Sequence, residues 1–379
     1  MESVAFIIVS SFILLFYNQI EKLYTMTMKK LIALGMSGGV DSSMALEYLK
    51  KDWDTIIGAN HVVWHGVKCS SPEVIARAED LCRRENIPFY CLDVSDEFDK
   101  RVAKAFVKDY LHGLTPNPCV ICNQFIKFTF FYDRLKDALI KDLIMSPSDQ
   151  LYYSTGHYVR LQERSGSLFL ARARDITKDQ SYMLYRLPKE LLARCVFPLG
   201  DKLKTDVKKE AAALGLPSSS VKESQDICFI EGSYGDFIEK YTGKQYQPGS
   251  IYDTQGNKLG LHRGYIHYTI GQRKGLGLGS GPWYVTQVIP EKNRVIVGRE
   301  EEQGQHDFTV RDLNWFVDFK GPLEAAVQVR YNSGCHPCTA EPGEGGTVLV
   351  HLREKTVITP GQSAVFYDGD VVLGGGIIA

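Results

Sequence analysis

The amino-acid sequence predicts an α/β protein that consists of a doubly wound parallel sheet, a small central domain and a C-terminal β-barrel. Short apolar strands alternate with amphipathic helices from residue 28 to about residue 222, as in a parallel sheet covered on both faces. Beyond Cys228 the composition shifts to glycine, tyrosine and β-branched residues, and from about residue 286 short strands alternate with turns. We therefore expect three domains, at 28–222, 223–285 and 286–379.

The composition is that of a globular protein and says little directly about function. A chain of 379 residues that is 44% hydrophobic can bury more than one core, which agrees with several domains. The net charge of −1 gives no global sign of a nucleic-acid partner, so local basic clusters would have to bind one. The nine cysteines are an odd number without the spacing of a disulfide framework, which favours a reducing, cytoplasmic location.

Residues 1–27 do not match the rest of the chain. The run from Val4 to Phe16 is almost wholly apolar, but it is too short to span a bilayer comfortably, and Glu2 stands where a signal peptide would carry positive charge. We expect a translated upstream extension that is not part of the fold and that ends before Met28. A membrane-surface or secretory anchor is the alternative.

The first predicted strand, 31–34, runs into a loop of small residues, 35–43, and a helix follows at 44–50. A strand that reopens as a helix after small residues presents free backbone N–H groups at the positive end of the helix dipole, which is a ready site for phosphate. Asp41 in this loop could hold a magnesium ion against the phosphates. No lysine follows the glycines, so the loop is not the common P-loop, and an ordinary strand-to-helix turn is the alternative.

The next elements continue the alternation. We predict strands at 55–60 and 88–93 and helices at 72–85 and 98–111. A parallel sheet built in this order binds its ligand at the carboxyl ends of the strands. The loop at 35–43 lies at that edge, and the segment 60–68 should flank an adenine base.

Residues 114–128 contain two prolines, an asparagine between them, and the pair Cys119 and Cys122. The prolines predict a stiff non-helical loop, with Cys122 at the opening of the next helix, where the helix dipole makes a thiol a better nucleophile. Three interpretations stay open from the residues alone. The segment is half of a zinc site, a redox pair, or one catalytic cysteine beside an incidental one.

The second half of the chain suggests an RNA-binding surface. Between residues 232 and 285, basic and polar side chains cluster near glycines: Arg263, His267, Gln272, Arg273 and Lys274. Such a surface suits RNA phosphates and splayed bases, and the glycine run 275–279 reads as an RNA-facing loop, since it lacks the context of a dinucleotide loop. Cys335 and Cys338 have the spacing of a zinc knuckle, but a zinc site needs four ligands.

The loop Ser37–Ser42 resembles the pyrophosphatase loop of ATP-dependent enzymes that adenylate a carbonyl oxygen and release pyrophosphate. Together with the segment 115–128 it makes the chain similar to the tRNA-specific 2-thiouridylases, whose N-terminal domain is adenine nucleotide alpha hydrolase-like. Further stretches that resemble this family lie at 154–158, 178–182, 224–230, 268–277 and 360–365. The resemblance therefore covers about residues 29–379.

The resemblance implies ATP-dependent 2-thiolation of the wobble uridine of tRNA. ATP and Mg²⁺ would be the cofactors, the anticodon region of tRNA the partner, and a cysteine desulfurase or a sulfur-relay protein the sulfur donor. After adenylation of the C2 oxygen, Cys228 would supply sulfur from a persulfide. Cys122 would be the nucleophile that resolves the intermediate, through a transient Cys122–Cys228 disulfide or by releasing hydrosulfide nearby. We expect no metal ion held by the protein itself and no stable membrane partner.

The same resemblance assigns binding residues. Those implied to bind ATP are Gly35, Met36, Ser37, Gly38, Gly39, Val40, Asp41, Ser42, His61 and Gly156. Those implied to contact tRNA or the target base are Asn117, Pro118, Cys119, His157, Lys178, Asp179, Gln180, Arg330, Tyr331 and Gln362. Two positions depart from the family pattern: Cys119 stands where many members carry an acidic residue, and His61 stands where a methionine usually contacts adenine.

Three other functions compete with this one. The first is a ligase that uses the same loop on a small molecule, which the large C-terminal half disfavours. The second is a metal-cluster tRNA thiolase that uses Cys119 and Cys122 as ligands. The third is a non-catalytic RNA-binding relative, which the intact loop and the cysteines at 122 and 228 disfavour.

Overall fold

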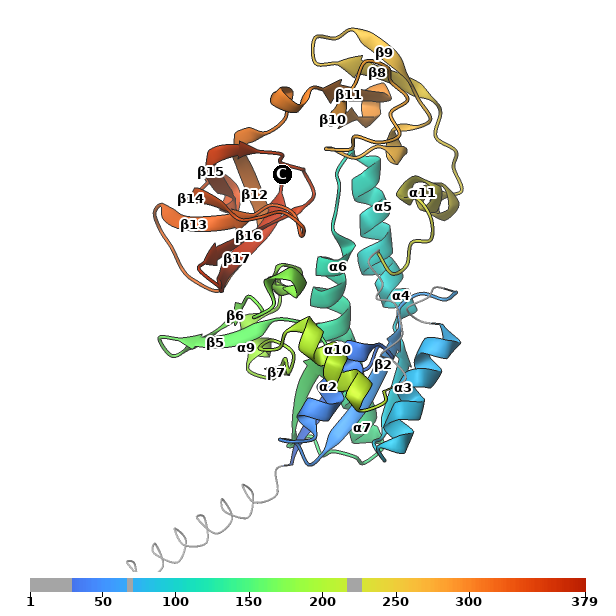
Figure 1. The fold of residues 1–379 in the computed structure, drawn as a ribbon, viewed down its shortest axis with the longest axis vertical. Helices are drawn as coiled ribbons and strands as arrows, with labels where there is room; N and C mark the ends of the chain where they lie inside the picture. Colours follow the sequence, from blue (N-terminus) through green and yellow to red (C-terminus); the bar gives the residue numbers. More distant parts are fainter. Residues whose placement is uncertain (1–28, 67–70, 217–226) are drawn as a thin grey trace, which may run out of the picture.

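The structure is a computed structural model, and it describes residues 29–66, 71–216 and 227–379 (Figure 1). The apolar extension predicted at 1–27 lies outside the described residues, and so do Ser224, Gln225 and Asp226 of the stretch around Cys228. Among the described residues, no helix is long and apolar enough to cross a membrane.

A five-stranded parallel sheet forms the N-terminal domain, as the alternating pattern predicted, in the order β3-β2-β1-β4-β7. Its strands are β1 (Lys30–Gly35), β2 (Ile56–Val62), β3 (Phe89–Asp93), β4 (Gln150–Thr155) and β7 (Cys195–Val196). On β1, Leu31 and Ala33 belong to one hydrophobic core, while Ile32 and Leu34 belong to another. Because successive side chains of a strand point to opposite faces, both faces of the sheet are covered.

Helices complete the two cores. One core includes side chains of α2 (Val40–Leu49), α3 (Pro72–Arg84) and α10 (Lys204–Ala213). The other includes side chains of α5 (Lys104–Leu111) and α7 (Phe131–Lys141). The chain passes from β1 to β2 on one side and β4 flanks β1 on the other, so the strand order reverses beside β1. Ligands of open α/β sheets bind at such a switch point, and the loop after β1 opens there.

Several short helical segments connect these elements. The helix predicted at 98–111 is observed as α4 (Ser95–Phe98), a π-helical stretch Asp99–Ala103 and then α5. Further along the chain are α6 (Pro118–Ile121), a π-helical segment Cys122–Phe130, α8 (Ser181–Leu184) and α9 (Lys189–Leu192). Turns of 3₁₀ helix lie at Ile176–Lys178, Tyr265–His267, Pro290–Lys292, Glu300–Glu302 and Glu344–Gly346.

The central domain consists of α11 (Tyr234–Thr242) and a four-stranded sheet in the order β10-β11-β8-β9. The strands are β8 (Gly249–Asp253), β9 (Lys258–His262), β10 (Tyr284–Ile289) and β11 (Arg294–Gly298). The predicted domain boundary at residue 285 places β10 and β11 in the barrel, and this prediction was wrong. β11 pairs in parallel with β8, from which it is distant in sequence, so the boundary lies after Gly298.

The C-terminal domain is the predicted β-barrel. Its strands are β12 (Gln305–Trp315), β13 (Leu323–Gln328), β14 (His336–Pro342), β15 (Val348–Thr356), β16 (Ser363–Asp368) and β17 (Val371–Ile378). The additional pairing of β12 with β17 closes the barrel. The hairpin of β5 (Arg160–Arg164) and β6 (Ser167–Ala171) extends the sheet at β17. The fold is therefore of the mixed α/β class that the sequence predicted.

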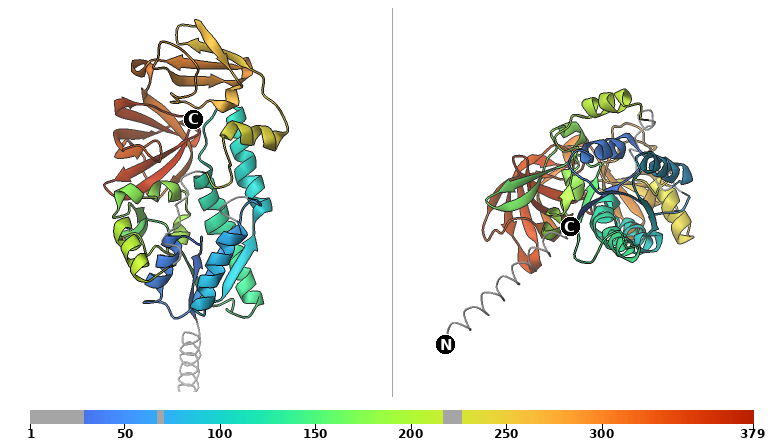
Figure 2. Two further views of the ribbon diagram at one scale, coloured as in Figure 1. Left: turned by 45° about the vertical axis from the view of Figure 1, so that its right-hand side comes forward. Right: turned by 90° about the horizontal axis from the view of Figure 1, so that it is seen from below.

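The three domains meet along α5 and α6. Figures 1 and 2 show the central sheet at the far end of α5 from the N-terminal sheet, with the barrel beside both. At this end of α5 the Tyr110 hydroxyl lies 3.4 Å from Thr269 Oγ1, and the Tyr265 hydroxyl donates to the Leu111 carbonyl at 3.3 Å. The central domain is thus attached to the helix that precedes the segment of Cys119 and Cys122.

Candidate functional site

The loop between β1 and α2 consists of small residues that hydrogen-bond to one another. Gly39 is the extended N-cap of α2 and supplies no side-chain cap to the first turn. Gly38 has φ of +66°, and a Cβ there would lie 2.7 Å from the Val74 carbonyl oxygen, so only glycine fits. The Ser42 hydroxyl donates to the Gly39 carbonyl at 3.1 Å and accepts from the Ser37 amide at 3.2 Å. This geometry suits an anion at the helix N-terminus.

Asp41, in the first turn of α2, is paired with a lysine that the sequence analysis missed. Lys204 Nζ lies 2.7 Å from each carboxylate oxygen of Asp41, and the Tyr158 hydroxyl donates to the same carboxylate at 2.9 Å. Lys204 is only 4% exposed and is the first residue of α10. A cation at a helix N-terminus is unfavourable because it opposes the helix dipole. This unusual position was the one sequence signal that could have indicated a special role for Lys204.

The end of β4 packs directly on this loop. A Cβ on Gly156 would lie 3.0 Å from the Asp41 Cβ and from the Ser42 backbone nitrogen, so a larger residue would displace the first turn of α2. Beyond it, His157 Nδ1 lies 2.6 Å from Thr155 Oγ1. Gly156 and His157, which the resemblance assigned to ATP and to tRNA respectively, therefore adjoin the loop between β1 and α2.

Two histidines mark the sheet edge on either side of β1. His61 lies near the end of β2 and His157 follows β4, and the two strands flank β1. Burial lowers the pKa of each to about 3, and the positive charge of Lys127 acts in the same direction on both. Both rings are therefore neutral at pH 7. Lys127 belongs to the π-helical segment that begins at Cys122, so this segment faces the same edge.

The segment of Cys119 and Cys122 is helical earlier than predicted. Asn117 is the N-cap of α6, its side chain accepts from the Cys119 amide at 3.1 Å, and Pro118 is the first helical residue. The prediction that Cys122 opens the helix was wrong, because an asparagine followed by proline is itself a helix start. Cys122 is 6% exposed and begins the π-helical segment, an irregularity common at functional sites.

α8 and the barrel hold this segment in place. Met183 in α8 accepts from Asn123 Nδ2 through its carbonyl at 3.1 Å, and its sulfur lies 3.6 Å from Asn117 Nδ2. From the barrel, Gln362 Nε2 donates to the Thr115 carbonyl at 2.6 Å. Two parts of the chain that are distant in sequence, α8 and the barrel, thus hold the segment before and after Cys119.

Asp179 and Gln180 make internal hydrogen bonds. Asp179 is 8% exposed, and its carboxylate accepts from the Ala173 amide at 2.9 Å and from the Ser181 hydroxyl at 2.7 Å. Gln180 Oε1 accepts from the Tyr158 amide at 2.9 Å. Both side chains hold the loop that carries Lys178.

Arg330 joins the barrel to the central domain. Its guanidinium donates to the Ile270 carbonyl at 2.8 Å and to Thr359 Oγ1 at 3.1 Å. The neighbouring Tyr331 is half-buried, and burial raises the pKa of its hydroxyl, with the electrostatic effects of Asp179 and Cys119 acting in the same direction. Tyr331 therefore lies close to the Cys119 segment, although it belongs to the barrel.

The residues after Cys228 are anchored by an aromatic cluster. The Phe229 ring lies 5.1 Å from that of Phe98, 5.3 Å from that of Phe237 and 6.0 Å from that of Trp64. Trp64 follows β2, so Cys228 is held near the end of that strand.

Within the described residues, neither cysteine pair belongs to a group of three or more side chains with metal-ligand spacing. The only His, Cys, Asp and Glu side chains there with metal-ligand spacing are Asp236, Glu239 and His267. Cys338 is buried in the barrel core whereas Cys335 is exposed, so these two do not form a zinc knuckle.

Comparison with known proteins divides the chain into the three observed domains. Residues 30–232 match the family model described as the tRNA methyl transferase HUP domain. Residues 235–299 match the tRNA methyl transferase PRC-barrel domain, and residues 305–378 match the aminomethyltransferase beta-barrel domain. The second match ends where β11 ends, in agreement with the corrected boundary.

Similar proteins are found among bacterial enzymes. The chain is 39% identical over 363 residues to the tRNA-specific 2-thiouridylase MnmA of Clostridium perfringens, covering 92% of this chain and 98% of that protein. It is 39% identical over 366 residues to the protein of the same name from Acetivibrio thermocellus, covering 92% of this chain and 99% of that one. For MnmA 1 of Caldanaerobacter subterraneus subsp. tengcongensis, the identity is 40% and the coverage 92% and 97%.

Solved structures give weaker similarities. An NH3-dependent NAD synthetase from Campylobacter jejuni has a TM-score of 0.30 and 16% identity, covering 55% of this chain and 75% of that one. The U34-tRNA thiolase NcsA from Methanococcus maripaludis, with its [4Fe-4S] cluster, has a TM-score of 0.31 and 15% identity, covering 56% and 67%.

Proposed function

Because this chain belongs to the tRNA-specific 2-thiouridylase family, we propose that it is an ATP-dependent tRNA-uridine 2-sulfurtransferase acting on the wobble uridine. The observation that supports this most directly is the position of Lys127. Its charge lowers the pKa of both His61 and His157, and it lies about one helical turn beyond Cys122. The cysteine-bearing segment and the phosphate-binding loop thus face one sheet edge.

The first step is adenylation of the target base. The C2 oxygen of the uridine attacks the α-phosphate of ATP, and pyrophosphate leaves. The uncapped first turn of α2 and the loop before it hold the phosphates through backbone N–H groups, which stabilise negative charge there. Asp41 fits a magnesium ion, since it offers a carboxylate at this position, and a bound Mg²⁺ would neutralise phosphate charge.

Lys204 supplies the cation that the loop itself lacks. In this structure its ammonium is held by Asp41, within reach of the N-terminus of α2. We propose that Lys204 shares its charge with the phosphates of bound triphosphate, and that Asp41 would then be the carboxylate that could hold a magnesium ion. The pair keeps both groups beside the loop before the substrate arrives.

The second step transfers sulfur. The terminal sulfur of a persulfide on Cys228 attacks C2 and displaces AMP, which leaves the base joined to Cys228 through a disulfide. The Cys122 thiolate then attacks Cys228 Sγ, so that the Cys122–Cys228 disulfide forms and the second sulfur leaves with the base as 2-thiouridine. A cellular thiol reductant must return two electrons before the next turnover. The donor that charges Cys228 is a cysteine desulfurase or a sulfur-relay protein.

tRNA recognition is divided between direct contact and positioning. We propose that Lys178 and Tyr331 contact the anticodon region, because Tyr331 lies close to Cys119 and to Asp179, the residue that follows Lys178. Asp179, Arg330 and Gln362 make the internal hydrogen bonds described above, and they act by holding those contact residues and the backbone near Cys119. Cys119 faces Tyr331 and lies next to the target base, without acting as a general base.

The proposal is tested with purified protein, ATP, Mg²⁺, unmodified tRNA and a cysteine desulfurase with labelled sulfur. Nucleoside mass spectrometry should find labelled 2-thiouridine at the wobble position, in equal amount to AMP and pyrophosphate in a single turnover. Formation of AMP on a small amide or nucleotide instead of tRNA would favour the small-molecule ligase. Thiolation that requires protein-bound iron would favour the cluster mechanism.

A further inference from the structure

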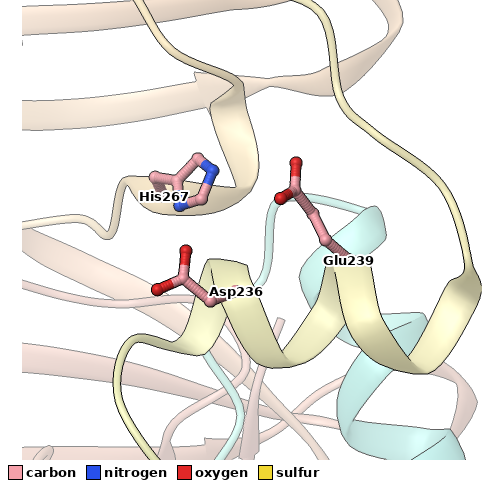
Figure 3. Close-up of side chains that lie close together, drawn as sticks. All are labelled: Asp236, Glu239 and His267. Carbon is pink, nitrogen blue, oxygen red and sulfur yellow. The ribbon is translucent and has the colours of Figure 1, made fainter.

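A group of metal-ligand side chains lies outside the site described above. Asp236 and Glu239 are one turn apart on α11, and His267 ends the 3₁₀ turn that follows β9. One ligand atom from each lies within 4.8 Å of the others. In Figure 3 the His267 ring stands over α11, with one nitrogen towards Asp236 and the other on the side of Glu239. Among the described residues, this is the only group with such spacing.

The histidine is the second, independent indication of a ligand. His267 Nδ1 is buried and has no hydrogen-bond partner in the structure. Its ring is pressed against the helix, since a Cβ on Gly235 would lie 2.0 Å from Nδ1. A buried nitrogen without a partner is costly and unusual in proteins. One ring nitrogen of His267 lies within 4.8 Å of an oxygen of each carboxylate, and the three groups would together complete a site for a cation.

The carboxylates can move to close the site. Ligand atoms around an ion bound at 2.0–2.1 Å are about 3.3 Å apart in tetrahedral geometry, somewhat less than the 4.8 Å limit seen here. Asp236 is exposed and Glu239 is half-buried, so both side chains are able to rotate. Glu239 Oε1 also accepts from the Tyr246 amide at 3.2 Å, which orients this carboxylate as outer hydrogen bonds do in metal sites.

We propose that Asp236, Glu239 and His267 bind one divalent transition-metal ion, preferentially Zn²⁺, with water in the remaining position. Imidazole nitrogen with two carboxylates suits Zn²⁺, whereas Mg²⁺ and Ca²⁺ prefer oxygen ligands alone. The ion would tie α11 to the central sheet. Phe237 of α11 packs on Phe229, the neighbour of Cys228. By holding α11 in place, the ion would therefore also stabilise the segment that carries Cys228. The binding site itself does not depend on the function proposed for Cys228.

The test uses the full chain, freed of metal with a chelator and then dialysed. Zn²⁺ binding is measured by isothermal titration and by the rise in Tm, for the parent and for D236N, E239Q and H267Q. Glu231→Gln is the matched control, because this exposed carboxylate precedes α11. Cys122→Ser and Cys228→Ser identify zinc bound by thiols. Circular dichroism without metal shows whether each variant is folded.

We expect one Zn²⁺ per chain in the parent, in Glu231→Gln and in both cysteine variants. Each ligand variant should bind it more than about tenfold more weakly and lose the rise in Tm. Equal binding by the parent and the three ligand variants overturns the proposal, as does the absence of zinc binding by the parent. Loss of the ion only in the cysteine variants overturns it as well, because the ion would then lie elsewhere.

Discussion

Replacing Lys204 by methionine should damage adenylation far more than folding. The ammonium lies 2.7 Å from the Asp41 carboxylate, and its side chain is 6% exposed, whereas that of Asp41 is 28% exposed. Breaking a fully buried pair costs about 3–5 kcal/mol, and because Asp41 is partly solvated we expect about 2 kcal/mol here. That is less than the usual 5–15 kcal/mol stability of a folded protein, so the variant should stay folded.

The effect on the reaction should be larger. Removing one charge-stabilising group from a preorganised site lowers kcat about 10²–10³-fold, equivalent to about 2.7–4 kcal/mol in the barrier. Lys202→Met is the matched control: it removes the same charge two residues earlier, from a side chain that lies 4.5 Å over the Tyr48 ring. We expect the control to react within about threefold of the parent, a loss of at most about 0.7 kcal/mol.

The assay is tRNA-dependent exchange of pyrophosphate into ATP, which reports adenylation before sulfur arrives. Asp41→Asn should also abolish exchange, and the double variant Asp41→Asn/Lys204→Met should be less destabilised than the sum of the two single variants, because the pair is removed together. If Lys204→Met exchanges pyrophosphate as fast as Lys202→Met, Lys204 only supports the fold and the reasoning is refuted.

Three further predictions concern the surroundings of this loop. Burial lowers the pKa of His61 and of His157 to about 3, so the unfolded chain binds a proton at each histidine at a higher pH than the folded chain does, and the free energy of unfolding falls as pH drops below about 6.5. Replacing either histidine by glutamine should make the urea midpoint depend less on pH between pH 6.5 and 4.5, and an unchanged pH dependence would contradict the lowered pKa. Gly156→Ala should lower the unfolding free energy by about 1–3 kcal/mol in urea titration and weaken ATP binding, whereas Gly321→Ala, in open space, should do neither. Arg330→Lys loses the paired contacts between barrel and central domain, so kcat/KM for tRNA should fall about tenfold while ATP affinity is kept, and an equal loss of both would argue for a general folding defect.

The N-terminal domain was predictable because its signals are local. Alternating strands and helices predicted the parallel sheet, and the small residues at 35–43 predicted the loop between β1 and α2, whose role in binding phosphate stays a prediction. The start of α6 was missed although its signal was also local, since Asn117 and Pro118 are a good N-cap and first helical residue. Here two prolines were read as excluding a helix, whereas one of them begins it.

The errors and omissions elsewhere come from contacts between residues distant in sequence. β11 joins the central sheet by pairing with β8, and nothing within the strand itself distinguishes that partner from a barrel strand. Lys204 reaches Asp41 across 163 residues, and Gln362 reaches Thr115 across 247. Periodicity describes which face of an element is buried, but it does not say which polar side chains meet, so these contacts required the folded chain.

The division of labour between the cysteines is the central claim, and single-turnover thiolation of an anticodon stem-loop tests it most directly. Cys228→Ser should form AMP on tRNA but accept no labelled sulfur from a desulfurase, because it lacks the persulfide site. Cys122→Ser should accept sulfur and stall with the label still on the protein. Cys119→Ser should stay within about tenfold of the parent, about 1.4 kcal/mol, since its thiol takes no part in either step. Equal loss of activity in the Cys119 and Cys122 variants, with iron or zinc bound to the parent and lost from both, would contradict the account.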